Sequence, residues 1–388
     1  MRIFLSRGVL FRPLAVVALS LLGLTLIAAI AQACNVPVFR FALERWRADA
    51  YRVTVFYEGP LTAAEKELLT KLEEQQEKSR ANVQIQVLNV AELEEAEQQL
   101  LKSLPMAKFP QLVAQYPAPL QIEVPVWSQP FTASATAHLL DSPLRKDLLN
   151  RLVDGETAVW LLLECGNAEK DNAAATLLNE QLAKLAKELQ LPELTDLPDD
   201  NLVAKTPLKL SFSMLRVPRG KAEAPLVQML VNSESDLPER ADPMIFPVFG
   251  RGRALFPLIG AGITADNIRN SAAFLCGACS CEVKELNPGF DLLLSADWDE
   301  LLSADGKPLP IVKTRNLPSG EAELVTIPQG KAQVIPTATT ATEASSRAVT
   351  SARPPGSNSA VYTVIALFGA LVVFIVLANL HKTNPAGH

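Results

Sequence analysis

Cysteines near position 280 are the residues of this chain whose type and spacing most clearly indicate chemistry. Cys276, Cys279 and Cys281 combine a C-x-x-C spacing with a C-x-C spacing. Neighbouring thiols form disulfides in an oxidising compartment, exchange disulfides where a thiol pKa is lowered, and bind soft metals such as Cu(I) or Zn(II). Cys165 makes the set even once Cys34 is set aside, and the sequence leaves the pairing open.

The position of a predicted helix separates these chemistries. The helical pattern over residues 266–274 comes before the cysteines, so they follow a helix C-terminus, whereas a helix lowers a thiol pKa at its N-terminus. The sequence therefore favours structural disulfides. Three alternatives stay open: a thiol–disulfide oxidoreductase using Cys276 and Cys279, a copper or zinc site in which the cluster takes Cys165 or Cys34 as a further ligand, and free thiols.

A glycine-rich turn carries a second group of candidates. Arg251 and Arg253 alternate with Gly250 and Gly252 directly after a strand-like run that ends at Phe249. Glycines let the backbone approach a ligand closely, and arginines bind carboxylates or phosphates, so this turn is the best candidate anion site. The simpler interpretation is a turn with exposed arginines. No organic cofactor is predicted.

Other short patterns have simpler explanations than catalysis. Residues 260–265 match the letters of a dinucleotide fingerprint, but little strand precedes them. The carboxylates of Asp297, Asp299 and Glu300 fit the start of a helix better than a catalytic pair. His138, the one histidine outside the C-terminal tail, is more simply a partly exposed side chain than a base.

Both ends of the chain carry long apolar stretches. Residues 1–33 combine three arginines, an uncharged middle and a small-residue exit, which is typical of a signal peptide cleaved after Ala33. An uncleaved anchor and a lipid-modified Cys34 are the alternatives. Residues 361–380 match the length of a single transmembrane helix, and residues 381–388 form a short tail that we expect to be cytoplasmic.

Residues 336–359 are rich in Ala, Thr, Ser and Pro, which indicates a flexible linker between the C-terminal helix and a folded body. The sequence therefore predicts a single-pass protein of the cell membrane whose body lies outside the cytoplasm. Charge is near balance, with 36 basic and 42 acidic residues and a net charge of −6 in 388 residues. Because no long run of Lys or Arg occurs, nucleic acid is not an expected partner.

The body reads as two successive α/β modules, over residues 34–150 and 151–335. The first contains a strand at 51–57, a helix introduced by the capping-box pair Thr62 and Glu65, and a strand at 82–90, a β-α-β pattern that favours a parallel sheet. Its other expected elements are helices at 39–46 and 91–104 and a strand at 120–127. The second contains strands at 158–164, 208–217, 226–231 and 244–249 and helices at 172–190 and 266–274.

Two such modules after an export signal resemble tandem thioredoxin-like domains. The resemblance implies a cysteine pair before the first long helix of each module, where this chain has Glu58-Gly59-Pro60-Leu61 and Cys165-Gly166-Asn167. A catalytic pair is absent from both positions. The alternative is two generic α/β domains of unrelated topology.

Two sequence blocks resemble a group of bacterial exported, membrane-anchored proteins without an established activity. The blocks are ACNVPVFR with ALERW, beginning at Ala33, and CSCEVK with NPGFDLL and DWD, beginning at Cys279. The resemblance implies location and architecture, and it transfers no functional residue.

These observations favour a membrane-tethered extracytoplasmic protein that acts as a non-catalytic binding or accessory component of an envelope complex. The expected partners are the membrane, through the C-terminal helix, and another envelope protein. An envelope thiol–disulfide oxidoreductase and a copper or zinc thiolate carrier are the alternatives.

Overall fold

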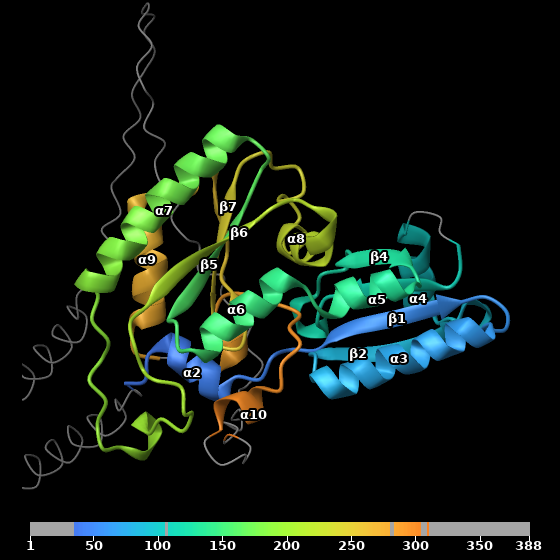
Figure 1. Ribbon diagram of the computed structural model, residues 1–388, viewed down its shortest axis with the longest axis horizontal. Helices are drawn as coiled ribbons and strands as arrows, with labels where there is room; N and C mark the ends of the chain where they lie inside the picture. The colour runs from blue at the N-terminus through green and yellow to red at the C-terminus, as the bar shows by residue number, and fades with distance from the viewer. Residues whose placement is uncertain (1–34, 105–107, 280–282, 304–308, 310–388) are drawn as a thin grey trace, which may run out of the picture. The chain divides into compact units, whose positions relative to one another are not determined.

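The computed structural model describes residues 35–104, 108–279, 283–303 and 309, which belong to the unit Ala33–Ala332 (Figure 1). The predicted signal segment, Cys34, Cys281, the linker at 336–359, the helix at 361–380 and the tail at 381–388 lie outside these residues. Within the described residues, no helix has both the length and the apolar character needed to span a bilayer.

A four-stranded sheet occupies the first half of the described chain, in the order β2-β1-β3-β4. Strands β1 and β2 are parallel, and the other neighbours are antiparallel. The strands are β1 (Tyr51–Tyr57), β2 (Val83–Asn89), β3 (Gln111–Gln115) and β4 (Trp127–Pro130). The helices of this half are α3 (Ala63–Ser79), η1 (Val90–Glu92), α4 (Glu95–Ser103), η2 (Ala118–Leu120), α5 (Ala133–Leu140) and α6 (Pro143–Val153).

A six-stranded sheet follows, with the order β10-β8-β7-β5-β6 and with β9 paired to β7. Its strands are β5 (Ala158–Leu163), β6 (Phe212–Val217), β7 (Met244–Phe249), β8 (Arg253–Ala254), β9 (Leu258–Ile259) and β10 (Phe290–Asp291). The accompanying helices are α2 (Val38–Arg45), α7 (Ala168–Glu188), η3 (Pro198–Asp200), η4 (Lys221–Glu223), α8 (Ala224–Val231), η5 (Gly260–Gly262), α9 (Ala265–Cys276), η6 (Lys284–Leu286) and α10 (Trp298–Leu302).

The two sheets repeat one topology. In each, the first strand is parallel to the second and antiparallel to the third, and the third is antiparallel to the fourth. A long helix joins the first two strands in both cases, α3 in the first sheet and α7 in the second. A proline also stands directly before each third strand, Pro110 before β3 and Pro243 before β7, and the Phe109–Pro110 peptide is cis. The described chain is therefore a mixed α/β protein with an internal structural repeat.

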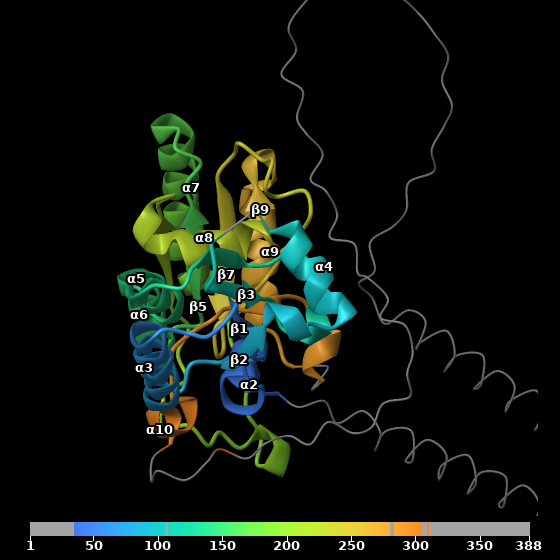
Figure 2. The same ribbon diagram turned by 90° about the vertical axis from the view of Figure 1, so that its right-hand side faces the viewer.

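Each sheet has helices on both faces. In the second sheet, α7 and α9 cover one face, and α6 and α8 cover the other (Figure 1). In the first sheet, α3 and α5 lie on one face and α4 on the opposite face (Figure 2). Alternation along β5 explains the layers, because Trp160 points into the cluster under α7 while Leu161 points into the cluster under α8.

One apolar cluster joins the two sheets. It contains Tyr51 and Val53 of β1 together with Leu161 of β5 and Phe246 of β7. Two buried tyrosine hydroxyls also join the two halves: Tyr51 of β1 donates to the Asp291 carbonyl of β10 at 2.6 Å, and Tyr116, after β3, donates to the Met229 carbonyl of α8 at 2.6 Å. Helix α2 precedes the first sheet in the chain but packs in the cluster of the second sheet. The predicted boundary between residues 150 and 151 stays a prediction.

Several elements confirm the sequence analysis. Strand β1 has the predicted bounds, and the helix after it begins with the predicted capping box, in which Thr62 and Glu65 bond each other's backbone amides. The β-α-β unit is confirmed for β1 and β2. The expectation of a parallel sheet is wrong for the other pairs of the first sheet, because β3 runs antiparallel to both of its neighbours, β1 and β4.

Two predicted strands are wrong. Residues 226–231 form helix α8, with Pro225 in its first turn and apolar side chains buried around most of its surface. A short apolar run has no period that separates a strand from a buried helix, so the pattern could not decide. Residues 120–127 lie mostly in irregular structure between η2 and β4, where Pro125 has no backbone amide to donate.

Candidate functional site

The candidate site lies where β5 ends and α7 begins. Glu164, Cys165 and Gly166 link the two elements, and Gly166 has a φ of +89°, which favours glycine. Asn167 caps α7 by accepting the backbone amides of Glu169 and Lys170, each at 3.1 Å. This sharp turn places Cys165, which is half-buried, directly before the first turn of a long helix.

A buried carboxylate fixes this turn. Asp171 is 3% exposed, and its two carboxylate oxygens accept the backbone amides of Cys165 at 2.8 Å and Gly166 at 3.1 Å. Asp171 also lies in the first turn of α7, where the positive end of the helix dipole favours a negative charge. The Cys165 backbone is thereby held in one conformation.

An ion pair links the start of α7 to the loop before β7. Lys170 Nζ lies 2.8 Å from Asp242 Oδ1, and both side chains are about half exposed, at 52% and 43%. The hydrogen bond and the charge of Asp242 raise the pKa of Lys170, with a smaller contribution from nearby Cys165. Because the pair is exposed to solvent, it contributes little to stability, but it places both charges beside the same opening.

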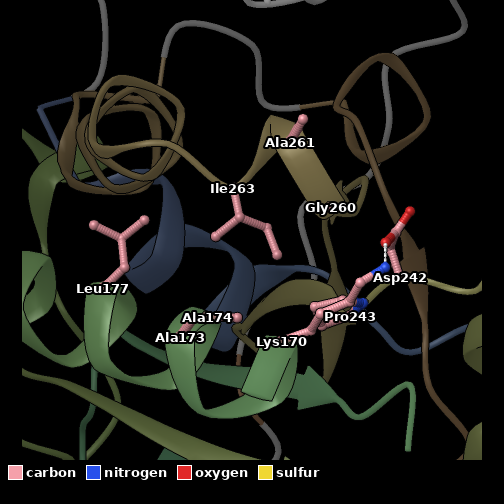
Figure 3. Close-up of a pocket in the computed structure, with 9 residues that line it drawn as sticks. All are labelled: Lys170, Ala173, Ala174, Leu177, Asp242, Pro243, Gly260, Ala261 and Ile263. Carbon is pink, nitrogen blue, oxygen red and sulfur yellow. Dashed lines mark hydrogen bonds and ion pairs between the residues drawn. The ribbon is translucent and has the colours of Figure 1, made fainter. Parts of the chain in front are cut away.

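A pocket of about 320 Å³ opens beside this ion pair. Its wall is formed by α7, the Asp242–Pro243 loop and the segment from η5 into α9 (Figure 3). Gly260 donates its backbone amide to the Pro243 carbonyl at 3.0 Å, which holds two of these walls together. The lining is Lys170, Ala173, Ala174, Leu177, Asp242, Pro243, Gly260, Ala261 and Ile263.

The composition of the pocket indicates binding. Small and aliphatic side chains form most of its wall, and the Lys170–Asp242 pair is its charged group. Such a lining suits an apolar side chain flanked by polar backbone groups, because the apolar wall provides contact area and the charges provide orientation. A nucleophile with a neighbouring general base, which a catalytic pocket requires, is not found among its lining residues.

The corresponding turn of the first sheet has no thiol. Glu58, Gly59, Pro60 and Leu61 join β1 to the capping residue Thr62, and Gly59 has a φ of +67°. The two turns therefore share a glycine in a left-handed conformation but differ in chemistry. Cys165 remains the one cysteine that follows a first strand in either sheet.

The cysteine cluster lies elsewhere, at the end of α9. Cys276 is the last residue of that helix, and Cys276 and Cys279 are each 2% exposed. Burial raises the pKa of the Cys276 thiol to about 12. Cys279 donates its backbone amide to the Val36 carbonyl at 2.9 Å, so the start of the described chain runs beside the cluster. This geometry does not favour redox exchange, and the pairing of the cluster stays a prediction.

The described residues place no metal site around the predicted thiolates. Among the described residues, no group of three or more His, Cys, Asp or Glu side chains could hold a metal ion. Cys281 and Cys34 lie outside those residues, so the copper or zinc site stays a prediction.

The predicted anion site is buried. Arg251 and Arg253 are 8% and 6% exposed, and Arg251 donates to the backbone carbonyls of Leu43 and Glu44. Arg253 donates to the Asp291 carboxylate at 3.2 Å and to carbonyls of the segment 284–288. These arginines connect α2 and β10 to the turn after β7. The geometry does not favour an anion site, and the expectation of exposed arginines is wrong.

The remaining candidates have structural roles. Asp297 caps α10 by accepting the Glu300 backbone amide at 3.1 Å, which confirms the predicted helix start. Asp299 lies 3.5 Å from Arg251 Nη2. His138 is exposed on α5, and its carbonyl accepts a hydrogen bond from the buried Arg145 at 2.7 Å.

Sequence reasoning missed the residues that form the pocket. Lys170 and Asp242 are 72 positions apart, and a lone Lys and a lone Asp carry no pattern. One signal was available: Pro243 directly precedes a buried strand, as Pro110 does in the first sheet. Repetition of that arrangement could have identified the loop.

Comparisons with known proteins find no matching family model and no matching curated protein. Among solved structures, similarity is found to the first two thioredoxin domains of Saccharomyces cerevisiae Eps1p, with 12% identity, a TM-score of 0.19, and coverage of 60% of this chain and 94% of that one. The first two thioredoxin domains of Naumovozyma dairenensis Eps1p match at 11% identity and a TM-score of 0.19, covering 61% and 93%.

The zinc-bound form of human ERp44 matches at 11% identity and a TM-score of 0.18, covering 62% of this chain and 58% of that one. At this level of similarity the three solved structures carry no argument about the function of this chain. The repeated strand order of this chain is the stronger observation, and it rests on this chain alone.

Proposed function

We propose that this chain is a membrane-tethered extracytoplasmic protein whose two thioredoxin-like modules bind another envelope protein without catalysing a reaction. One observation carries the proposal. The pocket beside α7 has an apolar wall and a Lys170–Asp242 ion pair, while the turn before α7 carries a single thiol, Cys165. The pocket supports binding. The turn before α7 has no second cysteine, which a catalytic disulfide exchanger needs to release its substrate.

The thioredoxin-like assignment is supported by the repeated topology. Both sheets have a parallel first pair, two antiparallel additions and a long helix that starts at the end of the first strand. In a fold of this kind, ligands bind at the edge where first strands end and helices begin. The pocket of the second sheet lies at that edge, beside the N-terminal turns of α7.

The membrane location is supported by the two charge-free stretches of the sequence, from Leu14 to Ala31 and from Val361 to Leu380. Mass spectrometry of the mature protein tests the first, and the expected N-terminal residue is Cys34. Reporter enzymes fused before Val361 and after His388 test the second. We expect opposite protection of the two reporters, and equal protection would contradict a single-pass topology.

Filling the pocket tests the binding proposal. Ala173 lines the pocket and is exposed, so Ala173→Trp blocks the opening without replacing a core side chain. Asn179→Trp is the matched control, because Asn179 is exposed on the same helix and outside the pocket lining. Full-length protein is crosslinked in its own membranes, and the partners are quantified by mass spectrometry.

We expect Ala173→Trp to lower the yield of the main crosslinked partner at least tenfold and Asn179→Trp to leave that yield unchanged. Equal yields for wild type and both variants would contradict binding at the pocket. Turnover of a disulfide substrate by the purified wild-type protein, lost in the Ala173→Trp variant, would contradict a non-catalytic role.

Thiol–disulfide exchange is the second candidate, and the placement of Cys165 before α7 favours it. In this reaction the Cys165 thiolate attacks a partner disulfide, forms a mixed disulfide and releases one partner thiolate, which takes up a proton. Cys165→Ser should abolish a mixed disulfide trapped by acid quenching and alkylation. If the mixed disulfide persists in that variant and disappears in Cys279→Ser, the cluster after α9 is the reactive site.

A further inference from the structure

The loop between α7 and β6 carries several exposed acidic and apolar side chains within a short stretch of chain. Leu194, Leu197 and Val203 are 37%, 38% and 38% exposed, and each belongs to the small set of large apolar side chains that the described chain leaves in solvent. Carboxylates of Glu193 and Asp196 stand between and beside them, both exposed. We call residues 193–203 the acidic loop. A concentration of exposed apolar side chains marks interaction surfaces more often than scattered ones do.

The acidic loop is held in place by α2. Arg45 donates to the carbonyl of Asp199 at 2.6 Å and to that of Asn201 at 3.4 Å. The buried Glu44 carboxylate accepts the backbone amides of Val203 and Ala204, each at 3.1 Å. Because these contacts fix the second half of the loop, its apolar side chains are displayed on an ordered backbone and pay less entropy on binding.

Internal bonds also order the first half. The Asp200 carboxylate accepts the amide and hydroxyl of Thr195 at 2.9 and 2.6 Å, and its other oxygen accepts the amide of Asn35 at 2.7 Å. Asp200 is therefore used by the chain itself. Glu193 and Asp196, in contrast, form no ion pair with any of the described residues.

The negative charge of the acidic loop indicates which kind of partner it binds. No Lys or Arg occurs between Leu189 and Ala204. Asp200 is buried and Arg45 of α2 lies beside Asp199, so Glu193 and Asp196 supply the exposed negative charge of the loop. An anionic lipid surface is repelled by such a loop, and so is a second copy of the same loop. A segment that combines positive charge with apolar side chains is attracted by the carboxylates and buries the leucines.

We propose that the acidic loop is a docking surface for a basic, apolar segment of a partner protein. The surface shares no residue with the pocket beside α7, so the proposal stands apart from the function proposed above. The partner contributes Lys or Arg side chains opposite Glu193 and Asp196 and apolar side chains over Leu194 and Leu197.

Photo-crosslinking in the full-length protein tests this proposal. Benzoylphenylalanine replaces Leu197, and in a matched control it replaces Phe274, which is 37% exposed on α9. Both variants are irradiated in the membranes of the cells that produce them, and the crosslinked peptide is sequenced by mass spectrometry. A third variant carries benzoylphenylalanine in place of Leu194, which shows whether the result depends on the single position 197.

We expect labels at 194 and 197 to crosslink to one segment of another protein that carries net positive charge and apolar residues, and the label at 274 to miss it. Adding Glu193→Lys and Asp196→Lys should lower that yield at least fivefold. A crosslink to lipid, to residues 310–335 of this chain, to an acidic or neutral segment, or to nothing would overturn the proposal. Loss of the pocket partner in Ala173→Trp with the loop crosslink retained would show the two surfaces to be independent.

Discussion

Arg40 Nε donates to Glu44 Oε1 at 2.7 Å, one turn apart on α2, and each side chain is 1% exposed. Glu44 also accepts the amides of Val203 and Ala204, so one carboxylate joins α2 to the acidic loop. Burial lowers the pKa of Arg40, and the attraction of Glu44 opposes that shift. The pair thereby holds together two segments that are far apart in the sequence.

The first prediction concerns this pair. Glu44→Gln leaves the buried Arg40 charge without its partner, so we expect the free energy of unfolding to fall by about 3–5 kcal/mol. Urea unfolding followed by tryptophan fluorescence measures the change. Glu67→Gln is the control, because Glu67 bonds Lys71 in an equally spaced pair that is exposed, at 67% and 64%. A loss in the control as large as that in Glu44→Gln would contradict the importance of burial.

The second prediction concerns thiol accessibility. Because burial raises the pKa of Cys276 to about 12, almost no thiolate forms there at pH 8, and solvent reaches only 2% of the residue. In protein kept under reducing conditions, we therefore expect iodoacetamide to label Cys165, which is half-buried, and to spare Cys276 until the protein is unfolded. Peptide mapping after timed labelling measures both rates. Equal rates in the native protein would mean that the end of α9 opens readily.

The third prediction concerns pH. Burial raises the pKa of Asp49, the negative charge of Asp291 raises it further, and Lys284 and Arg253 oppose the shift. A carboxyl whose folded pKa is raised binds more protons in the folded state, so it costs stability as pH rises from about 4 through the raised value. Asp49→Asn removes this titration.

We expect the free energy of unfolding of wild type to decline between pH 4 and 7 relative to that of Asp49→Asn. Urea unfolding at closely spaced pH values compares the two curves. Parallel curves would show that Lys284, whose Nζ lies 2.8 Å from Asp49 Oδ1, cancels the effect of burial.

The fourth prediction compares two glycines. Gly250 has a φ of +58°, and a Cβ built on it would lie 2.7 Å from Ala42 Cβ, so α2 approaches the turn after β7 closely. Gly166 has a φ of +89° with open space around it. Gly166→Ala should therefore lose about 1–2 kcal/mol from the left-handed backbone alone, and Gly250→Ala should lose clearly more. Similar losses in thermal unfolding would indicate that α2 shifts at little cost.

Some helices and strands of this fold can be predicted from short stretches of sequence. Tyr51 to Tyr57 is rich in β-branched and aromatic residues, and Thr62 with Glu65 marks a helix start, so both were predictable. The start of α10 at Asp297 was predictable for the same reason. Residues 226–231 were not, because an apolar run of that length is compatible with a strand and with the buried helix α8.

The candidate site depends on contacts between distant residues. Lys170 and Asp242 meet only because the antiparallel pairing of β7 with β5 brings the loop before β7 to the start of α7. Arg251 and Arg253 look exposed from their glycine neighbours, but carbonyls of α2 and the segment 284–288 surround them in the fold. Partners of this kind leave no pattern in a single sequence.

The position of α2 sets an order on the assembly of the protein. This helix emerges near the start of the chain, yet its apolar face is completed by Trp160 of β5 and Phe249 of β7, which are made after the entire first sheet. Because synthesis begins at the N-terminus, α2 cannot bury its apolar face until the second sheet has been synthesised and folded. Until then chaperones and proteases can reach the helix. A segment from the start of the chain thus completes the core of the second sheet. Cleavage of the chain between the two sheets would therefore separate the second sheet from α2, which it needs for a complete core.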